Sequence, residues 1–177
     1  VTRKKILALV VSAWLLLPGA GIGKELKKMT TLMISCGAFS NGESIPTRFT
    51  CDGQDVNPML EWNNPPVGTR SLALIMDDPD APMGTWVHWV VWNIPPDTRR
   101  IEEMSVPAGA VQGHNGWKRN AYGGPCPPSG THRYFFKIFA LDTVLTLPDT
   151  ATKTDLERAI KGHILARGEL MGTYERR

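Results

Sequence analysis

The stretch TWVHWVVWNI, residues 85–94, predicts a β-strand in the core of the protein. Tryptophan, valine and isoleucine favour strands, and the two prolines that follow end the run because they lack a backbone N–H to donate. The stretch HRYFFKIFAL, residues 132–141, predicts a second strand after a loop rich in proline and glycine. A third candidate is the compact run SLALIM, residues 71–76. Together these runs indicate a mainly β fold.

The rest of the chain adds turns and one helix. Residues 31–75 alternate short apolar runs with the turn clusters SNGES, CDGQDVNP and NNPPVGT. Within residues 152–170, Thr154 and Glu157 fit a capping box. One face of the predicted helix then carries residues at helical spacing: Leu156, Ala159, Ile160, His163 and Ile164. We expect His163 to pack or hydrogen-bond where helix and sheet meet, and ELMGTYERR at the end to add a short strand.

Length and charge narrow the class of protein. The 177 residues suffice for one domain with a sizeable core. The formal net charge is +3, and Arg3, Lys4 and Lys5 account for the whole excess. The rest of the chain has no basic stripe with interleaved aromatic residues, which argues against nucleic-acid binding.

The N-terminus has the layout of a secretory signal peptide. A basic cluster precedes the apolar run at residues 6–17, and a stretch of small residues with one proline follows it. We therefore expect a signal peptide at residues 1–23, a linker at 24–30, one domain at 31–177 and a periplasmic or secreted protein. The alternatives are an uncleaved anchor, or translation that starts at Met29 and leaves the protein in the cytoplasm.

The three cysteines are Cys36, Cys51 and Cys126. In an oxidising compartment two of them can pair, and Cys51 and Cys126 are the preferred pair because both lie in turn-rich segments. Three buried free thiols remain the alternative. The spacing contains no C-x-x-C, so a zinc ribbon is not supported.

Polar side chains stand at the ends of the predicted strands. Alternation places four residues on one face of the strand at 85–94: Trp86, His88, Val90 and Trp92. By the same rule His132 and Tyr134 share a face, while Arg133 points the other way and is expected to form a structural ion pair. Both strands thus begin with an imidazole beside an aromatic ring, directly after a loop of prolines and glycines.

The segment DDPDAP ends the third predicted strand, so polar residues stand at the ends of all three strands. We expect Asp78 to reach a pocket shared with the two histidines, and assign Asp77 and Asp80 to hydrogen bonds within the loop. The peptide bond before Pro82 is a candidate for cis geometry.

Such a pocket has the chemistry of an anion site. Imidazoles and a tyrosine hydroxyl offer donors to the oxygens of an anion, and Asp78 would orient a histidine and hold it protonated. A wall of Trp86 and prolines suits the carbon part of a phosphate ester. Either histidine taken singly is more simply read as a satisfied core residue; the two together favour a shared site.

At these residues the chain resembles the phosphatidylethanolamine-binding protein family, in the bacterial and archaeal branch often labelled Raf kinase inhibitor-like. The similarity is carried by DPDAP at residues 78–82, GPCPPSGTHRY at 124–134 and FTCDGQDVNPMLEW at 49–62. Asn57 stands where a serine is usual in the family. The resemblance runs from about Ile34 to the end of the chain.

The resemblance implies a fold and a set of site residues. The fold would be an antiparallel β-sandwich of two sheets with one or two peripheral α-helices. The pocket would accept phosphate-like groups and phosphoethanolamine-type headgroups. Its residues, carried over by motif, would be Asp78, Trp86, His88, Pro127, Pro128, His132 and Tyr134, with Pro82 shaping the rim.

The leading hypothesis is a non-enzymatic protein, without cofactor, whose anion pocket binds phosphate esters or phospholipid headgroups, with a regulatory role as one option. Neither Ser71 nor Ser129 lies in a nucleophile-elbow setting. The first alternative is a regulator that acts by protein contact, such as a peptidase or kinase inhibitor, through the excursion at residues 97–131. The second is a metal-dependent enzyme, for which the ligands would be Asp78 or Asp80 with His88 and His132.

Overall fold

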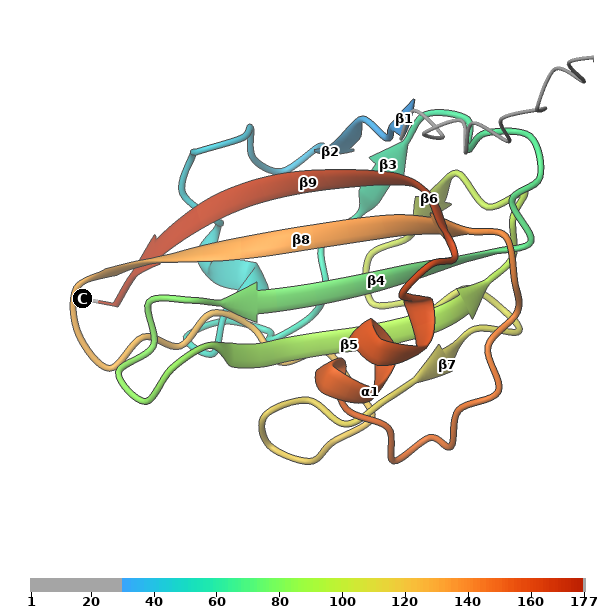
Figure 1. Ribbon diagram of the computed structural model, residues 1–177. Coiled ribbons are helices and arrows are strands. Elements are labelled where there is room, and N and C mark those ends of the chain that lie inside the picture. The colour runs from blue at the N-terminus through green and yellow to red at the C-terminus, as the bar shows by residue number, and fades with distance from the viewer. Residues whose placement is uncertain (1–29, 177) are drawn as a thin grey trace, which may run out of the picture.

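The computed structural model describes residues 30–176, which form two β-sheets and one α-helix (Figure 1). The predicted signal peptide and nearly all of the predicted linker lie outside the described residues. The elements in chain order are β1 (Thr30–Thr31), β2 (Ile34–Cys36), the 3-10 helix η1 (Thr47–Phe49), β3 (Leu60–Trp62), β4 (Ser71–Asp78), β5 (Trp86–Ile94), β6 (Arg100–Ile101), β7 (Val111–Gln112), β8 (Thr131–Leu141), α1 (Lys153–Ile160) and β9 (Ile164–Glu175). Within residues 30–176, no helix has the length and apolar character needed to cross a membrane.

The larger sheet has six strands in the order β1-β9-β8-β4-β5-β7, and the smaller has the order β2-β3-β6. The three strands expected from the sequence, β4, β5 and β8, lie side by side and pair antiparallel. The predicted sandwich of two sheets is therefore confirmed. One pair departs from the antiparallel pattern, because β1 runs parallel to β9.

Both faces of the larger sheet are buried. One face packs against the smaller sheet, where Trp89, Tyr134 and Phe136 meet Leu60 and Trp62 in the main core. The other face forms a second cluster with α1, which lies across β4 and β5 (Figure 1): Ala73, Ile75, Val90, Trp92, Leu156 and Ile160 are its chief members. Burial on two faces explains why the sequence of β4 is a continuous apolar run.

A β-bulge in β5 changes which residues share a face. Met76 pairs with Trp89 and Asp77 pairs with Val87, so His88 has no partner on β4. The extra residue reverses the alternation from that point. The prediction that Val90 and Trp92 share a face with Trp86 and His88 is therefore wrong, because Val90 and Trp92 face the helix.

The helix is shorter than predicted and begins earlier. Its N-cap is Thr152, which exchanges hydrogen bonds with Asp155 in a capping box, so the predicted box of Thr154 and Glu157 is wrong. Aspartate at the third helical position makes the same reciprocal bonds as glutamate. After Ile160 the chain turns at Gly162, whose φ of 88° ends the helix, and β9 begins at Ile164.

The tail that follows α1 pairs with β8 along its length as β9, the strand expected at the end of the chain but longer than predicted. His163 is therefore not on the helix. It lies exposed between α1 and β9, where its Nδ1 is 2.8 Å from a carboxylate oxygen of Asp142. It hydrogen-bonds at the boundary of helix and sheet, as expected.

Asp77 anchors α1 to the sheet. Its buried carboxylate accepts hydrogen bonds from Lys137 on β8 at 2.7 and 2.9 Å and from Lys153 on α1 at 2.5 Å. The assignment of Asp77 to the loop's own hydrogen bonds is therefore wrong. A carboxylate that is 1% exposed requires charged partners, and the chain supplies two.

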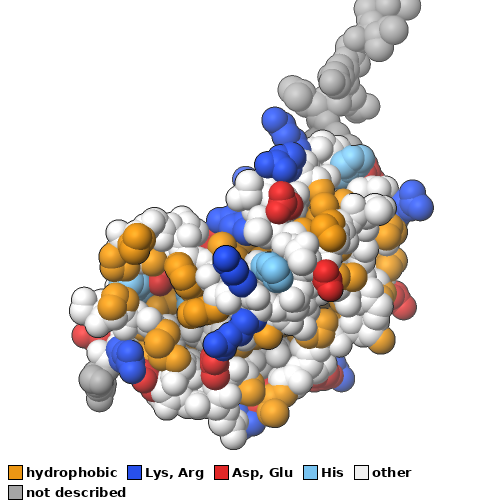
Figure 2. Space-filling model, turned by 90° about the horizontal axis from the view of Figure 1, so that it is seen from below, with side chains coloured by type: hydrophobic (Ala, Val, Ile, Leu, Met, Phe, Trp, Pro, Cys, Tyr) orange, Lys and Arg blue, Asp and Glu red, His pale blue; other side chains and the backbone are white. Residues whose placement is uncertain are grey.

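On the face seen in Figure 2, lysines and arginines lie among acidic and apolar side chains and do not gather into one stripe. This surface includes the region around α1 and β7. The distribution agrees with the neutral balance of the sequence after its first residues.

Candidate functional site

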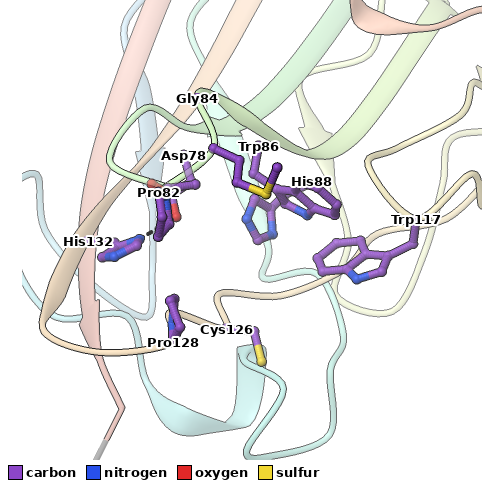
Figure 3. A pocket seen from close by; sticks show the side chains of 11 residues that line it. Asp78, Pro82, Gly84, Trp86, His88, Trp117, Cys126, Pro128 and His132 are labelled. Atoms are coloured by element: carbon purple, nitrogen blue, oxygen red, sulfur yellow. Dashed lines mark hydrogen bonds and ion pairs between the residues drawn. The ribbon is translucent and has the colours of Figure 1, made fainter.

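A pocket of about 430 Å³ opens where β4 ends and β5 and β8 begin (Figure 3). Three strand ends therefore converge, as the sequence predicted. Six of the eight predicted site residues line this pocket: Asp78, Pro82, Trp86, His88, Pro128 and His132. The residues that sequence reasoning did not assign to it are Ala81, Met83, Gly84, Trp117 and Cys126. No lysine or arginine is among the lining residues.

The two other predicted residues lie behind the pocket wall. Pro127 is buried and does not line the cavity. Tyr134 is fully buried on the same face of β8 as His132, and its ring meets that of His88 edge to face at 5.2 Å. Both residues thus support the lining residues from beneath.

Asp78 holds the imidazole of His132. One carboxylate oxygen of Asp78 is 2.7 Å from Nδ1 of His132, and the other accepts a hydrogen bond from the backbone N–H of Asp80 at 2.8 Å. Both side chains are buried. Because a carboxylate can only accept, Nδ1 of His132 carries a proton. Its Nε2 has no hydrogen-bond partner within residues 30–176.

Asp80 was expected to bond within its own loop, and this is wrong. Its two oxygens accept from the guanidinium of Arg133 at 2.9 and 2.7 Å, and one also accepts from the backbone N–H of Arg133. These hydrogen bonds from Arg133 lower the pKa of Asp80 to about 2. The pair ties the loop after β4 to β8 from outside the pocket, and Arg133 is the structural ion-pair partner that alternation predicted.

His88, like His132, is fixed through Nδ1, but its partner is a backbone group. Its Nδ1 donates to the carbonyl oxygen of Gly123 at 2.6 Å, since that oxygen can only accept. Burial lowers the pKa of His88, so the ring is neutral at pH 7. The neutral ring presents an unprotonated Nε2, which has no partner in the described part of the chain.

The hydroxyl of Tyr134 is buried and has no hydrogen-bond partner within residues 30–176. Burial, and after it the charge of Asp78, raises the pKa of this hydroxyl, so it stays protonated. Buried polar groups are paired in the great majority of cases. The hydroxyl lies behind the pocket wall, because Tyr134 is fully buried and does not line the cavity.

Trp117 forms one side of the pocket and comes from the loop after β7. Its indole meets the indole of Trp86 at 5.3 Å and the ring of His88 at 5.3 Å, both edge to face. Two glycines make room for this arrangement. A Cβ at Gly116 would lie 2.5 Å from Trp86, and a Cβ at Gly123 would lie 2.5 Å from Trp117.

One signal in the sequence pointed to Trp117 as a site residue: a large apolar side chain in a polar loop that contains glycines is not explained by core packing. The signal was insufficient, since nothing in the loop's spacing indicates its distance from β5. The long excursion at residues 97–131 nonetheless supplies three lining residues, Trp117, Cys126 and Pro128, and also the Gly123 carbonyl that orients His88.

A disulfide joins Cys51 to Cys126, the pair preferred from the sequence, and Cys126 lines the pocket. Further bonds hold the same loop. The backbone N–H of Gly124 donates to Asp55 at 2.6 Å, and the hydroxyl of Tyr122 donates to the carbonyl of Phe49 at 2.8 Å. The pocket wall is thus fastened to the segment around η1.

Two other expectations can be compared with the geometry. No cis peptide bond occurs in the described residues, so the prediction of a cis bond before Pro82 is wrong. Within residues 30–176 the structure also has no cluster of three or more His, Cys, Asp or Glu side chains placed to hold a metal ion. The hypothesis of a metal-dependent enzyme at Asp78, His88 and His132 finds no support in that part of the chain.

Comparison with known proteins places these features in a family. A family model described as phosphatidylethanolamine-binding protein matches residues 35–175. A UPF0098 protein of the archaeon Methanothermobacter thermautotrophicus is 50% identical over 144 residues, which cover 78% of this chain and 95% of that protein. A UPF0098 protein of Pyrococcus horikoshii is 44% identical, with 98% of this chain and 91% of that protein covered.

Solved structures show the same fold. A putative phosphatidylethanolamine-binding protein homologue from Chlamydia trachomatis superposes with a TM-score of 0.80 at 40% identity, covering 84% of this chain and 99% of that one. YbcL of Escherichia coli, described as a member of the mammalian family, gives a TM-score of 0.79 at 30% identity over 84% of this chain and all of its own.

Proposed function

Because this chain belongs to the phosphatidylethanolamine-binding protein family, as its motifs predicted, we propose that its pocket binds a small anion such as the phosphate group of an ester or lipid headgroup. One observation carries the proposal. Two imidazoles from separate strands, His88 and His132, are each oriented through Nδ1, and each has an Nε2 without a partner in the described residues. Both rings line the same cavity.

Fixed rings suit anion binding because no rotamer freedom is lost when the ligand arrives. A protonated His132 would donate from Nδ1 to Asp78 and from Nε2 to an anion oxygen. The rim of Ala81, Pro82 and Met83 is apolar and suits the carbon part of an ester.

The proposal is for binding without catalysis. The lining residues include no serine, threonine or lysine, and the one cysteine among them is in the disulfide, so the pocket offers no hydroxyl, free thiol or amine as a nucleophile. The excursion at residues 97–131 contributes to this pocket, and we therefore assign it to ligand binding in place of the alternative role as a partner-binding loop.

No lysine or arginine lines the pocket, so the positive charge that faces a bound anion has to come from a histidine that takes up a proton. His88 is neutral when the pocket is free, because burial lowers its pKa, and an anion beside Nε2 favours the charged ring. Binding should therefore take up a proton between the pKa of His88 in the free protein and its higher pKa in the complex. Affinity should rise as pH falls and level off once His88 is protonated without ligand, with a slope of at most about tenfold per pH unit for one proton.

Isothermal titration with sulfate at about pH 8 and about pH 5.5 tests this, because sulfate keeps its charge over that range. We expect binding at both values and tighter binding at the lower one. Titrations with phosphate and phosphoethanolamine accompany it. If none of the three anions binds at either pH, the proposed function is wrong; if sulfate binds with one affinity throughout, the role given to His88 is wrong.

A further inference from the structure

The pocket has a second half that the two histidines do not occupy. Trp86 and Trp117 form its side wall, and Met83 stands at its rim. The indoles are 36% and 39% exposed, and Met83 is 98% exposed. Large apolar side chains that are exposed to solvent in a concave site indicate that a ligand group packs against them.

The two indoles are placed by the backbone. Gly116 lies against Trp86 and Gly123 lies against Trp117 so closely that a Cβ on either glycine would collide with the ring behind it. Gly123 also gives the carbonyl that holds His88. One short loop therefore sets the imidazole and the indole wall side by side, as Figure 3 shows for His88, Trp86 and Trp117.

The charge of this half favours a cation. No lysine or arginine lines the pocket, and Asp78 is the one carboxylate among the lining residues. The faces of indole rings carry partial negative charge and attract cations, tryptophan most strongly of the aromatic residues. A cation here would lie beside an anion held by the histidines, so a single zwitterionic ligand fits both halves.

The hydrogen-bond acceptors available near the two indoles indicate which kind of cation fits there. A primary ammonium has three N–H donors and loses hydration when it is buried unless acceptors replace the water. Each oxygen of Asp78 already accepts one hydrogen bond, from His132 or from the backbone of Asp80, and the neighbouring wall residues Ala81, Pro82 and Met83 offer no side-chain oxygen. A fully methylated ammonium needs no acceptor and gains from the aromatic surface.

We propose that Trp86 and Trp117 form a subsite for a methylated ammonium group carried by the same ligand whose phosphate the histidines bind. This inference rests on the proposed function. Trp117 is then a specificity residue of the pocket, and the ligand class is a phosphate ester of a quaternary amino alcohol, preferred over the corresponding primary amine.

The test compares four probes by isothermal titration: phosphocholine, phosphoethanolamine, inorganic phosphate and dimethylbutyl phosphate, in which a carbon atom replaces the nitrogen of choline. Phosphocholine and dimethylbutyl phosphate have nearly the same shape and differ in charge. We expect phosphocholine to bind roughly three- to thirtyfold more tightly than the neutral analogue. This ratio corresponds to the free energy of a cation–π interaction with an indole. Phosphocholine should also bind more tightly than phosphoethanolamine.

Variants assign the preference to the indole. In Trp117→Leu, which keeps an apolar side chain, the ratio of the two affinities should fall to about one, whereas Trp117→Phe should keep part of it. Met33→Leu, which changes an exposed apolar side chain outside the pocket lining, is the matched control and should keep the full ratio. Because each ratio is measured within one folded variant, a general loss of stability does not imitate the result.

The outcomes separate the two proposals. If the neutral analogue binds as tightly as phosphocholine, or if Trp117→Leu keeps the preference, the ammonium subsite is wrong while the anion site stands. If inorganic phosphate and all three esters fail to bind, the proposed function is wrong and the subsite with it.

Discussion

Replacing both Cys51 and Cys126 by serine is expected to lower the free energy of unfolding by about 4.5 kcal/mol, the chain-entropy value for a loop of this length. The two cysteines are 75 residues apart, so the disulfide closes a large loop and removes many conformations from the unfolded chain. Denaturant unfolding of the variant and of the oxidised wild type measures the difference. Reductant should lower the wild-type midpoint toward that of the variant.

The disulfide also fastens the pocket wall, so the same variant should bind phosphate less tightly than the wild type. Cys36→Ser is the matched control. Cys36 is half-buried and unpaired in the described chain, burial raises the pKa of its thiol, and its replacement should cost less than about 1 kcal/mol. Equal midpoints for the wild type and the double variant would contradict the account. An oxidising compartment, where the predicted signal peptide would direct the chain, keeps the bond formed.

Removing Nε2 of His88 is expected to weaken phosphate binding by about tenfold or more, the value of a hydrogen bond to a charged group. His88→Asn makes this change selectively. The asparagine amide reaches about as far as Nδ1 and can still donate to the carbonyl of Gly123, but it leaves the Nε2 position empty. His88→Gln extends further and can place an N–H near the Nε2 position, so it should bind better than His88→Asn.

His163→Ala is the control for this pair, since His163 pairs with Asp142 on the surface and does not line the pocket. It should bind phosphate like the wild type. Titration calorimetry at one pH gives all four affinities, and thermal unfolding checks that each variant is folded. If His88→Asn binds phosphate as well as the wild type, Nε2 of His88 is not a ligand for the anion.

The parts of the fold that the sequence predicted are those set by local composition. The apolar runs that became β4, β5 and β8 are long and bounded by prolines and glycines, so their type was evident. The convergence of their ends followed from the matching loops. The bulge at His88 could not be predicted, because it depends on the register in which β5 pairs with β4. Neither strand's sequence determines that register alone.

The missed contacts join residues that are distant in the sequence. Asp77 finds Lys137 and Lys153 at separations of 60 and 76 residues, so its local neighbours suggested a turn. Trp117 lies in a loop without periodicity, where spacing carries no information about burial. The family resemblance supplied Pro127 as a pocket residue, and strand alternation had already indicated Tyr134. The structure places both behind the wall.

The central claim is that Nε2 of His88 and Nε2 of His132 hold the anion. The most direct measurement is the nitrogen NMR spectrum of the histidine rings, recorded through two-bond couplings while inorganic phosphate is added. The chain has four histidines, so His114 and His163 serve as internal controls. We predict that the Nε2 signals of His88 and His132 shift with saturation while those of the controls stay in place. Unchanged signals for His88 and His132 at high phosphate would contradict the account.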